Sequence, residues 1–250
     1  MNVHSPQPPT ASEQSPQEDH LLRKRYEELA ELAGSLAHEI KNPLSVIHMN
    51  SELLSEEIAE SDSPIRRRAL DKIEIIRQQC QRMENLLRDF LRFARMQKVE
   101  LTPGSLNDQI DRVLKAYQAQ ADLNGVEILR YLDNDAPSIM INSDALQAAL
   151  MNLVKNALEA MEDGGQLLAR TYTTKKTVAI DLIDTGCGMD DNTIMHMFEP
   201  FYSSKNGGSG LGLPTAKKII EAHGGRISLQ SEVGRGTKFT IEFPMPPRLG

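Results

Sequence analysis

The sequence is poor in aromatic residues, contains no tryptophan and has only two cysteines. Phe, Tyr and Trp make up 4% of the 250 residues, which suits helix bundles packed through Leu, Ile, Ala and Met. No stretch approaches the roughly 18 consecutive apolar residues of a membrane-spanning helix, and the N-terminus lacks the apolar core of a signal peptide. Cys80 and Cys187 are too far apart in sequence to form a metal-binding pair. We therefore expect a cytoplasmic protein without direct membrane insertion.

The charge balance argues against a second group of functions. The chain has 28 Lys and Arg against 35 Asp and Glu, a formal net charge of −7. Bulk electrostatics of this sign does not favour binding to nucleic acid or to an anionic membrane surface. Hydrophobic residues at 40% and charged residues at 25% are ordinary for a globular protein, and 250 residues suffice for one large or two small domains.

The first part of the chain is predicted to be a disordered segment followed by two long helices. Residues 1–20 are rich in proline and poor in core-forming residues. Apolar residues then recur every three or four positions, as on one helix face, at Leu29, Leu32, Leu36, Ile40, Leu44 and Ile47. A second helix begins at an N-cap and N1 pair, Ser63 and Pro64. Its apolar residues repeat almost as heptads, at Ile65, Ala69, Ile73, Ile76, Cys80, Met83, Leu87, Phe90 and Ala94.

Two such helices form a hairpin over residues 21–98, and a lone hairpin leaves apolar surface exposed. We therefore expect a homodimer in which two hairpins make a four-helix bundle. Residues 99–105 are interpreted as a hinge linker. Beyond them, residues 106–247 predict an α/β domain, with helices near 107–121, 143–161 and 213–225 and strands near 126–132, 166–174, 177–184 and within 225–244. The predicted fold class is therefore α plus α/β.

The stretch HEIKNP, residues 38–43, places a histidine beside a glutamate just before a proline. A zinc-binding helix would read HExxH, but Asn42 occupies the second histidine position, so no metal site is predicted here. Pro43 has no N–H for the carbonyl of Glu39, which loosens the helix next to His38. Taken alone, His38 is either a structural residue or a nucleophile whose ring Glu39 orients.

The stretch DTGCGM, residues 184–189, follows an apolar predicted strand. Aspartic proteases also carry DTG, but they need two facing aspartates, and this helix-rich chain has a single such triplet. Gly186 and Gly188 instead indicate close approach of the backbone to a flat ligand. Asp184 would then accept a hydrogen bond from an exocyclic amine.

The glycine loop, residues 207–213 (GGSGLGL), directly precedes a predicted helix. Backbone N–H groups of a glycine-rich loop at a helix N-terminus suit phosphate. The sequence lacks the GxxxxGK[ST] of a P-loop, and the spacing of Gly208, Gly210 and Gly212 differs from GxGxxG. The loop therefore predicts either a phosphate contact or a flexible turn.

The stretch NLVKNALEAM, residues 152–161, carries Asn152 and Asn156 on one face of a predicted helix. Amides in an apolar helix cost free energy when they are buried without partners. Their oxygens suit a Mg²⁺–phosphate site, because magnesium prefers oxygen ligands and keeps some of its waters. The alternative is a pair of asparagines that cap or pack helices.

In this order, the motifs resemble the boxes of the sensor histidine kinases of two-component systems. The resemblance covers residues 21–247 and includes two further stretches, FEPFYSSK at 198–205 and GRGT at 234–237. It implies two modules. One is a dimerising four-helix bundle that bears the phospho-accepting histidine, and the other is an ATP-binding α/β sandwich of the gyrase–Hsp90–kinase–MutL type.

The resemblance implies that His38 is phosphorylated from ATP and passes the phosphoryl group to an aspartate of a response regulator. Glu39 would be the general base. Asn42 would position water if the protein also dephosphorylates that regulator. No sensor domain is recognisable before Leu21, so the signal is expected from a separate sensor protein or from a larger protein of which this chain is part.

The resemblance also implies which residues bind Mg²⁺ and ATP. Asn156 would bind Mg²⁺, supported by Asn152, with Lys155 near the phosphates, and Asp184 would bind the adenine amino group. The residues expected to shape the nucleotide pocket and its lid (residues 190–207), or to anchor that lid, are Gly186, Gly188, Phe198, Phe201, Gly208, Gly210, Leu211, Gly212, Leu213 and Thr237.

One departure from the family pattern concerns the phosphates. Many relatives have a lysine three residues after the magnesium-binding asparagine, whereas this chain has Glu159. A phosphate contact at that position is therefore not expected, and Lys155 or Lys205 is left to replace it.

Two other functions compete with the kinase. An ATPase of the same nucleotide fold would need a glutamate where Asn152 stands, and an amide cannot act as a base. A non-catalytic scaffold that binds regulators would not require the intact His38, Asn156 and Asp184.

Overall fold

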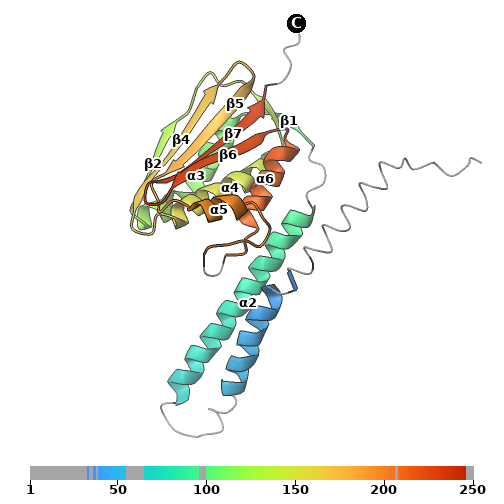
Figure 1. Cartoon of the computed structure of the whole chain (residues 1–250), viewed down its shortest axis with the longest axis vertical. Helices are drawn as coiled ribbons and strands as arrows, with labels where there is room; N and C mark the ends of the chain where they lie inside the picture. Colours follow the sequence, from blue (N-terminus) through green and yellow to red (C-terminus); the bar gives the residue numbers. More distant parts are fainter. Residues whose placement is uncertain are drawn as a thin grey trace, which may run out of the picture.

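The structure is a computed structural model that describes Ala33 and residues 36–37, 39–54, 65–95, 100–205 and 208–245. The predicted disorder of residues 1–20, the N-cap at Ser63 and the candidate nucleophile His38 lie outside these residues. Two long helices are followed by an α/β domain (Figure 1). The predicted fold class is confirmed.

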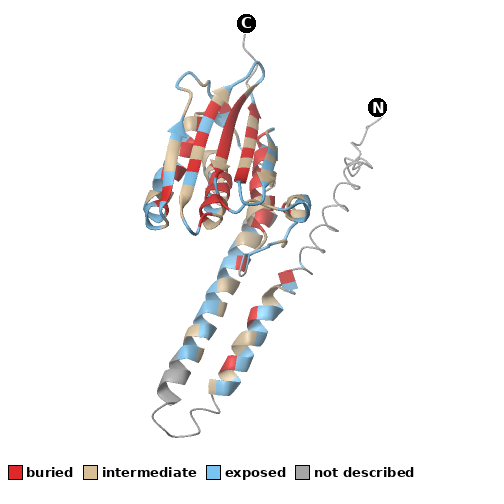
Figure 2. Ribbon diagram, turned by 60° about the vertical axis from the view of Figure 1, so that its left-hand side comes forward, coloured by how far each residue is buried: buried red, intermediate tan, exposed pale blue. Residues whose placement is uncertain are grey.

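The helix over residues 39–54 lies beside α2 (Ile65–Arg95) in both Figure 1 and Figure 2. Leu86 and Phe93 of α2 are buried, although neither belongs to the predicted apolar stripe. Two members of that stripe, Ile73 and Leu87, remain 48% and 47% exposed. The apolar surface of α2 is therefore wider than one helix neighbour can cover.

The α/β domain contains a five-stranded mixed sheet in the order β2-β4-β5-β7-β6, in which only β2 and β4 pair in parallel. The strands are β2 (Val126–Tyr131), β4 (Gly165–Thr173), β5 (Thr177–Asp184), β6 (Arg226–Glu232) and β7 (Gly236–Pro244). The helices are α3 (Leu106–Leu123), α4 (Ser143–Glu159), α5 (Asp191–His196) and α6 (Gly212–Ala222). Helices α3, α4 and α6 cover one face of the sheet (Figure 1). The buried residues concentrate between these helices and the sheet (Figure 2).

The alternation of side chains along the strands explains this core. Leu167 and Ala169 of β4 are buried on the helix-covered face, as are Ile180 and Leu182 of β5, which pair with β4 in register. Because side chains alternate between the two faces of a sheet, the apolar residues of β4 and β5 that face the helices form one continuous layer.

A second, two-stranded sheet changes one predicted boundary. β1 (Thr102–Gly104) pairs antiparallel with β3 (Ile139–Ile141), so residues assigned above to the hinge instead take part in the α/β domain. Ser105 then caps α3, since its side chain accepts a hydrogen bond from the N–H of Asp108. A three-residue strand with proline at its centre carries no periodicity from which it could be predicted.

Helices α4 and α6 are fixed to each other at their ends. The N-cap of α4 is Asn142, whose side chain accepts a hydrogen bond from the N–H of Ala145. The buried His223 accepts the backbone N–H of Asn142 at Nε2 (2.9 Å), while its Nδ1 lies 2.7 Å from the carbonyl of Ile219. Gly224 follows with φ +69°, the left-handed conformation that suits glycine after a helix.

Among the residues placed by the structure, none of the helices combines the length and apolar character needed to cross a bilayer.

Candidate functional site

A cleft of about 1190 Å³ lies between α2, α4, the lid and the glycine loop. Most of the residues predicted from the α/β motifs meet here. Those that line the cleft are Asn152, Lys155, Asn156, Asp184, Gly188, Lys205, Gly208, Gly210, Gly212, Leu213 and Thr237. The structure therefore brings together motifs that are up to 85 positions apart, from 152 on α4 to 237 on β7.

Other predicted residues lie outside the cleft lining. Leu211 is fully buried, and Phe198 packs on the core. Gly186 packs closely against Ala160 at the end of α4. A Cβ there would meet the carbonyl oxygen of Ala160 at 2.6 Å, so glycine is required for packing. On the helix over residues 39–54, Glu39 is partly buried and Asn42 is exposed.

Asp184, at the end of β5, is a buried carboxylate, and one of its two oxygens accepts hydrogen bonds from the protein. Its Oδ1 accepts the backbone N–H groups of Gly186 (3.0 Å) and Thr237 (3.1 Å). None of the described residues donates to Oδ2. Burial raises the pKa of Asp184 despite the two N–H groups and the charge of Lys205, which act in the opposite direction. The carboxylate can therefore accept a further hydrogen bond from a ligand inside the cleft.

The two asparagines of α4 have different environments. Asn152 Nδ2 donates to the carbonyl of Gly212 (3.0 Å) and thereby ties α4 to the start of α6. This is the packing role considered above as the alternative. No hydrogen bond joins the side-chain amide of Asn156 to the described residues, although it lines the cleft. Of the two amides, that of Asn156 is available to a ligand or a metal ion.

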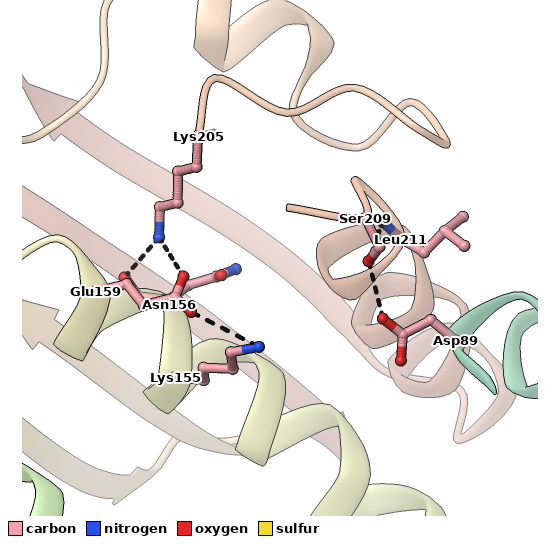
Figure 3. A network of polar contacts seen from close by, with 7 residues as sticks. All are labelled: Asp89, Lys155, Asn156, Glu159, Lys205, Ser209 and Leu211. Atoms are coloured by element: carbon pink, nitrogen blue, oxygen red, sulfur yellow. Dashed lines mark hydrogen bonds and ion pairs between the residues drawn. The ribbon is translucent and has the colours of Figure 1, made fainter. Parts of the chain in front are cut away.

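Three charged side chains meet beside Asn156 (Figure 3). Lys205 Nζ of the lid lies 2.7 Å from Glu159 Oε2 and donates to the backbone carbonyl of Asn156 at 3.4 Å. Lys155 Nζ lies 3.6 Å from Glu159 Oε1. Both lysines that were predicted to replace the missing phosphate contact therefore sit at the same carboxylate.

The backbone of the lid and glycine loop is tightly folded. Phe201 has φ +67°, a conformation that residues other than glycine rarely adopt, and its N–H donates to the carbonyl of Gly210 (3.1 Å). A Cβ at Gly210 would lie 2.3 Å from the backbone of Phe201. Helix α6 then starts without a side-chain capping bond. Because Pro214 in its first turn has no N–H, the N–H groups of Gly212 and Leu213 are the ones that remain available to an anion.

Helix α2 also lines the cleft, which its local sequence pattern does not indicate. Its lining side chains are Arg77, Gln78, Gln79, Gln81, Arg82, Asn85, Leu86 and Asp89. Asp89 Oδ2 accepts a hydrogen bond from Ser209 Oγ (2.9 Å, Figure 3), and Lys218 Nζ lies 4.0 Å from the ring centroid of Phe93. Polar residues on a long helix are usually solvated, so only the docking of the two domains reveals that these face a cleft.

Comparison with known proteins yields two family models in chain order. The His Kinase A (phospho-acceptor) domain matches residues 28–98, and the histidine kinase-, DNA gyrase B- and HSP90-like ATPase matches residues 141–247. Sporulation kinase E of Bacillus subtilis is 33% identical over 87% of this chain and 29% of its own length. NtrB of Rhodobacter capsulatus, a sensory histidine kinase/phosphatase, is 31% identical over 87% of this chain and 62% of its own.

The solved structures agree with the sequence matches. Histidine kinase ThkA, in complex with the response regulator protein TrrA, has a TM-score of 0.72 at 26% identity and covers 91% of this chain and 66% of that one. The fold and the cleft thus define a nucleotide-binding domain of the histidine kinase, gyrase and HSP90 class. Since a phospho-acceptor domain precedes it, the chain belongs to the sensor histidine kinases, which confirms the resemblance. It spans half or less of the length of the sporulation kinases that it matches.

Proposed function

We propose that this chain is an ATP-dependent autokinase that phosphorylates His38 and then passes the phosphoryl group to an aspartate of a response regulator. One observation carries the proposal. The cleft that holds the unoccupied oxygen of Asp184 and the free amide of Asn156 opens directly onto α2 of the helical hairpin. The domain that would bind ATP therefore faces the domain whose sequence carries the acceptor histidine.

The chemistry of the cleft fits Mg·ATP. Asp184 Oδ2 would accept the adenine amino group, and the N–H groups of α6 would face the phosphates. The described residues contain no group of three or more His, Cys, Asp or Glu side chains suited to a metal ion. Asn156 would therefore hold Mg²⁺ jointly with phosphate oxygens and water, as is usual for this ion. Bound Mg²⁺ would neutralise charge on the transferred phosphate.

Phosphoryl transfer depends mainly on positioning and charge stabilisation. A ring nitrogen of His38 forms the new N–P bond as the bond from the γ-phosphorus to the ADP oxygen breaks. Glu39, at the other ring nitrogen, fixes the tautomer and stabilises the positive charge that develops on the ring. These two roles derive from the sequence motif. The phosphohistidine then transfers its group to the regulator's aspartate, which regenerates the neutral ring.

Several features support the proposed partners. Apolar side chains on the hairpin are unusually exposed in the single chain, at Leu44, Leu53, Ile73, Leu87 and Leu91. A second copy that pairs hairpin with hairpin would bury them, so we propose a homodimer.

The complex of ThkA with TrrA supports a response regulator as the second partner. The exposed Asn42 and the kinase/phosphatase NtrB support a phosphatase activity of this chain toward the same regulator. The signal would come from a separate sensor protein or from another part of a larger protein to which this chain belongs, and the cell compartment would be the cytoplasm.

The competing ATPase is disfavoured by Asn152. In place of a catalytic glutamate, the structure has an amide whose nitrogen already donates to Gly212. Such a group cannot accept a proton from water.

Labelled ATP tests the proposal. With Mg²⁺, the full chain should acquire acid-labile, alkali-stable label on protein, and His38→Gln should abolish it without changing the affinity for ATP. Steady release of phosphate without labelled protein would point to the ATPase instead, and absence of ATP binding would leave a regulator-binding scaffold. His48→Gln, ten positions further along the sequence, is the matched control and should label normally, because His48 pairs with Glu52 at the surface.

A further inference from the structure

Glu159 stands where a carboxylate is electrostatically costly. It lies three residues after Asn156 and so shares its face of α4. A bound triphosphate next to Asn156 would repel it, since charges a few ångströms apart interact appreciably even at a protein surface. The side chain therefore needs a compensating function or compensating charges.

The compensating charges are present and differ in origin. Lys155 lies one turn away on the same helix and is 3.6 Å from Glu159 Oε1, whereas Lys205 comes from the lid and is 2.7 Å from Oε2. Each carboxylate oxygen thus takes one lysine (Figure 3). The contact with Lys205 is the shorter one, and it is the one that joins the lid to α4.

The ammonium group of Lys205 is only partly used by these contacts. A lysine has three N–H donors, and the described residues accept two, at Glu159 and at the carbonyl of Asn156. The third remains for a ligand. The side chain of Lys205 is 42% exposed and lines the cleft. Its charge also lowers the pKa of Asp184, against the larger effect of burial, which is consistent with a position above the same cleft.

We propose that Glu159 is a positioning residue that holds Lys205 beside Asn156, so that the free N–H of Lys205 contacts the phosphates of ATP. The inference rests on the proposed function only in taking ATP as the ligand. The lid, rather than α4, thereby supplies the cation that many relatives carry three residues after the magnesium-binding asparagine. Phosphate binding and the position of the lid become coupled, because Lys205 both contacts the phosphates and holds the lid against α4.

Equilibrium affinities of the full chain for ATP and adenosine test this role. Lys205→Met should weaken ATP binding about tenfold, the worth of one charged hydrogen bond, and leave adenosine binding unchanged. Glu159→Gln should weaken ATP binding about threefold, as expected for losing an exposed ion pair. In the Lys205→Met background, Glu159→Gln should cause no further loss, because Glu159 acts through Lys205.

A charge transfer provides the positive test. Glu159→Lys combined with Lys205→Met should recover most of the ATP affinity lost in Lys205→Met alone. The lysine introduced on α4 then supplies the positive charge beside the phosphates. Controls are Lys176→Met in the β4–β5 turn and Glu127→Gln on the edge strand β2, neither of which lines the cleft. Both should bind ATP as the unmodified chain does.

Two results would overturn the inference. One is an equal loss from Glu159→Gln in both backgrounds, which would indicate a role independent of Lys205. The other is tighter ATP binding by Glu159→Gln, which would show that the carboxylate only repels phosphate. Failure of the autokinase proposal would be recognised separately, as normal ATP binding without label on His38. A chain that does not bind ATP at all would refute both.

Discussion

The two faces of strand β5 carry two buried aspartates in opposite environments. Asp181 is fully buried on the face away from the helices and contacts Arg170 Nη2 (2.6 Å), Lys238 Nζ (3.1 Å) and Thr240 Oγ1 (2.8 Å). Asp184 is 5% exposed on the helix-covered face, and within the described part of the chain its only hydrogen-bond donors are two backbone N–H groups. One carboxylate is compensated by charge, whereas the other keeps an oxygen without a donor.

The pKa shifts follow this difference. Burial alone would raise the pKa of both groups. For Asp181, the hydrogen bonds from Arg170, Thr240 and Lys238 outweigh burial and lower the pKa, whereas for Asp184 the effect of burial prevails and the pKa is raised. A fully compensated buried charge stabilises the fold, while an undercompensated one reserves its acceptor for a ligand. The comparison therefore separates a structural aspartate from a binding aspartate on one strand.

The largest expected effect comes from Asp184→Asn. The amide oxygen can keep both backbone N–H partners, which places Nδ2 where the carboxylate is proposed to accept the adenine amine. Two donors then face each other, and ATP affinity should fall about a hundredfold. The unfolding free energy at neutral pH should not fall, because the substitution removes a carboxylate whose ionised form is disfavoured by burial. Calorimetric titration and denaturant unfolding measure the two quantities.

Inosine triphosphate gives a matched ligand for this variant. It carries a carbonyl oxygen where ATP has its amino group, so the introduced amide can donate to it. The preference for ATP over inosine triphosphate should therefore decrease in Asp184→Asn. A variant that loses both ligands equally, or that unfolds more easily, would assign Asp184 a structural role like that of Asp181 and remove the contrast.

The sequence identified one of these aspartates and not the other, for a physical reason. The strand over 177–184 was predicted from its apolar run, and Asp184 was singled out by the glycines that follow it. Asp181 lies within the run, and its partners come from β4 and β7, as far away as Thr240. Local patterns fix where a strand begins and ends, but the register between distant strands decides whether a buried charge is compensated.

The same limit applies to the cleft. The glycine loop and the helix with Asn152 and Asn156 were each recognisable because backbone geometry and helical spacing are local properties. The ion pair between Glu159 and Lys205 joins residues 46 positions apart, and the polar face of α2 reaches the cleft only through domain docking. The parallel pairing of β2 with β4 likewise leaves no trace in either strand.

A smaller effect is expected from Asp181→Asn. The variant keeps the shape of the side chain but leaves the cations of Arg170 and Lys238 without a counter-charge. Because Arg170 is half exposed and can be solvated, the loss of unfolding free energy should be about 2 kcal/mol rather than the full cost of an unpaired buried ion. ATP affinity should not change. Reduced ATP binding in this variant, at unchanged stability, would contradict a structural role for Asp181 and a binding role for Asp184 alone.

The smallest effect, and the sharpest test of the comparison, is the pH dependence of stability. The lowered pKa of Asp181 means that its contribution is complete above the unfolded-state pKa and is lost as the pH falls through the folded-state value. The raised pKa of Asp184 acts in the opposite direction, because the folded form binds more protons between the two values and folding gains as the pH falls. Between about pH 7 and about pH 3, Asp181→Asn should therefore lose less stability than the unmodified chain, and Asp184→Asn should lose more. Denaturant unfolding across this range measures the difference, and parallel curves for the two variants would show that the aspartates are equivalent after all.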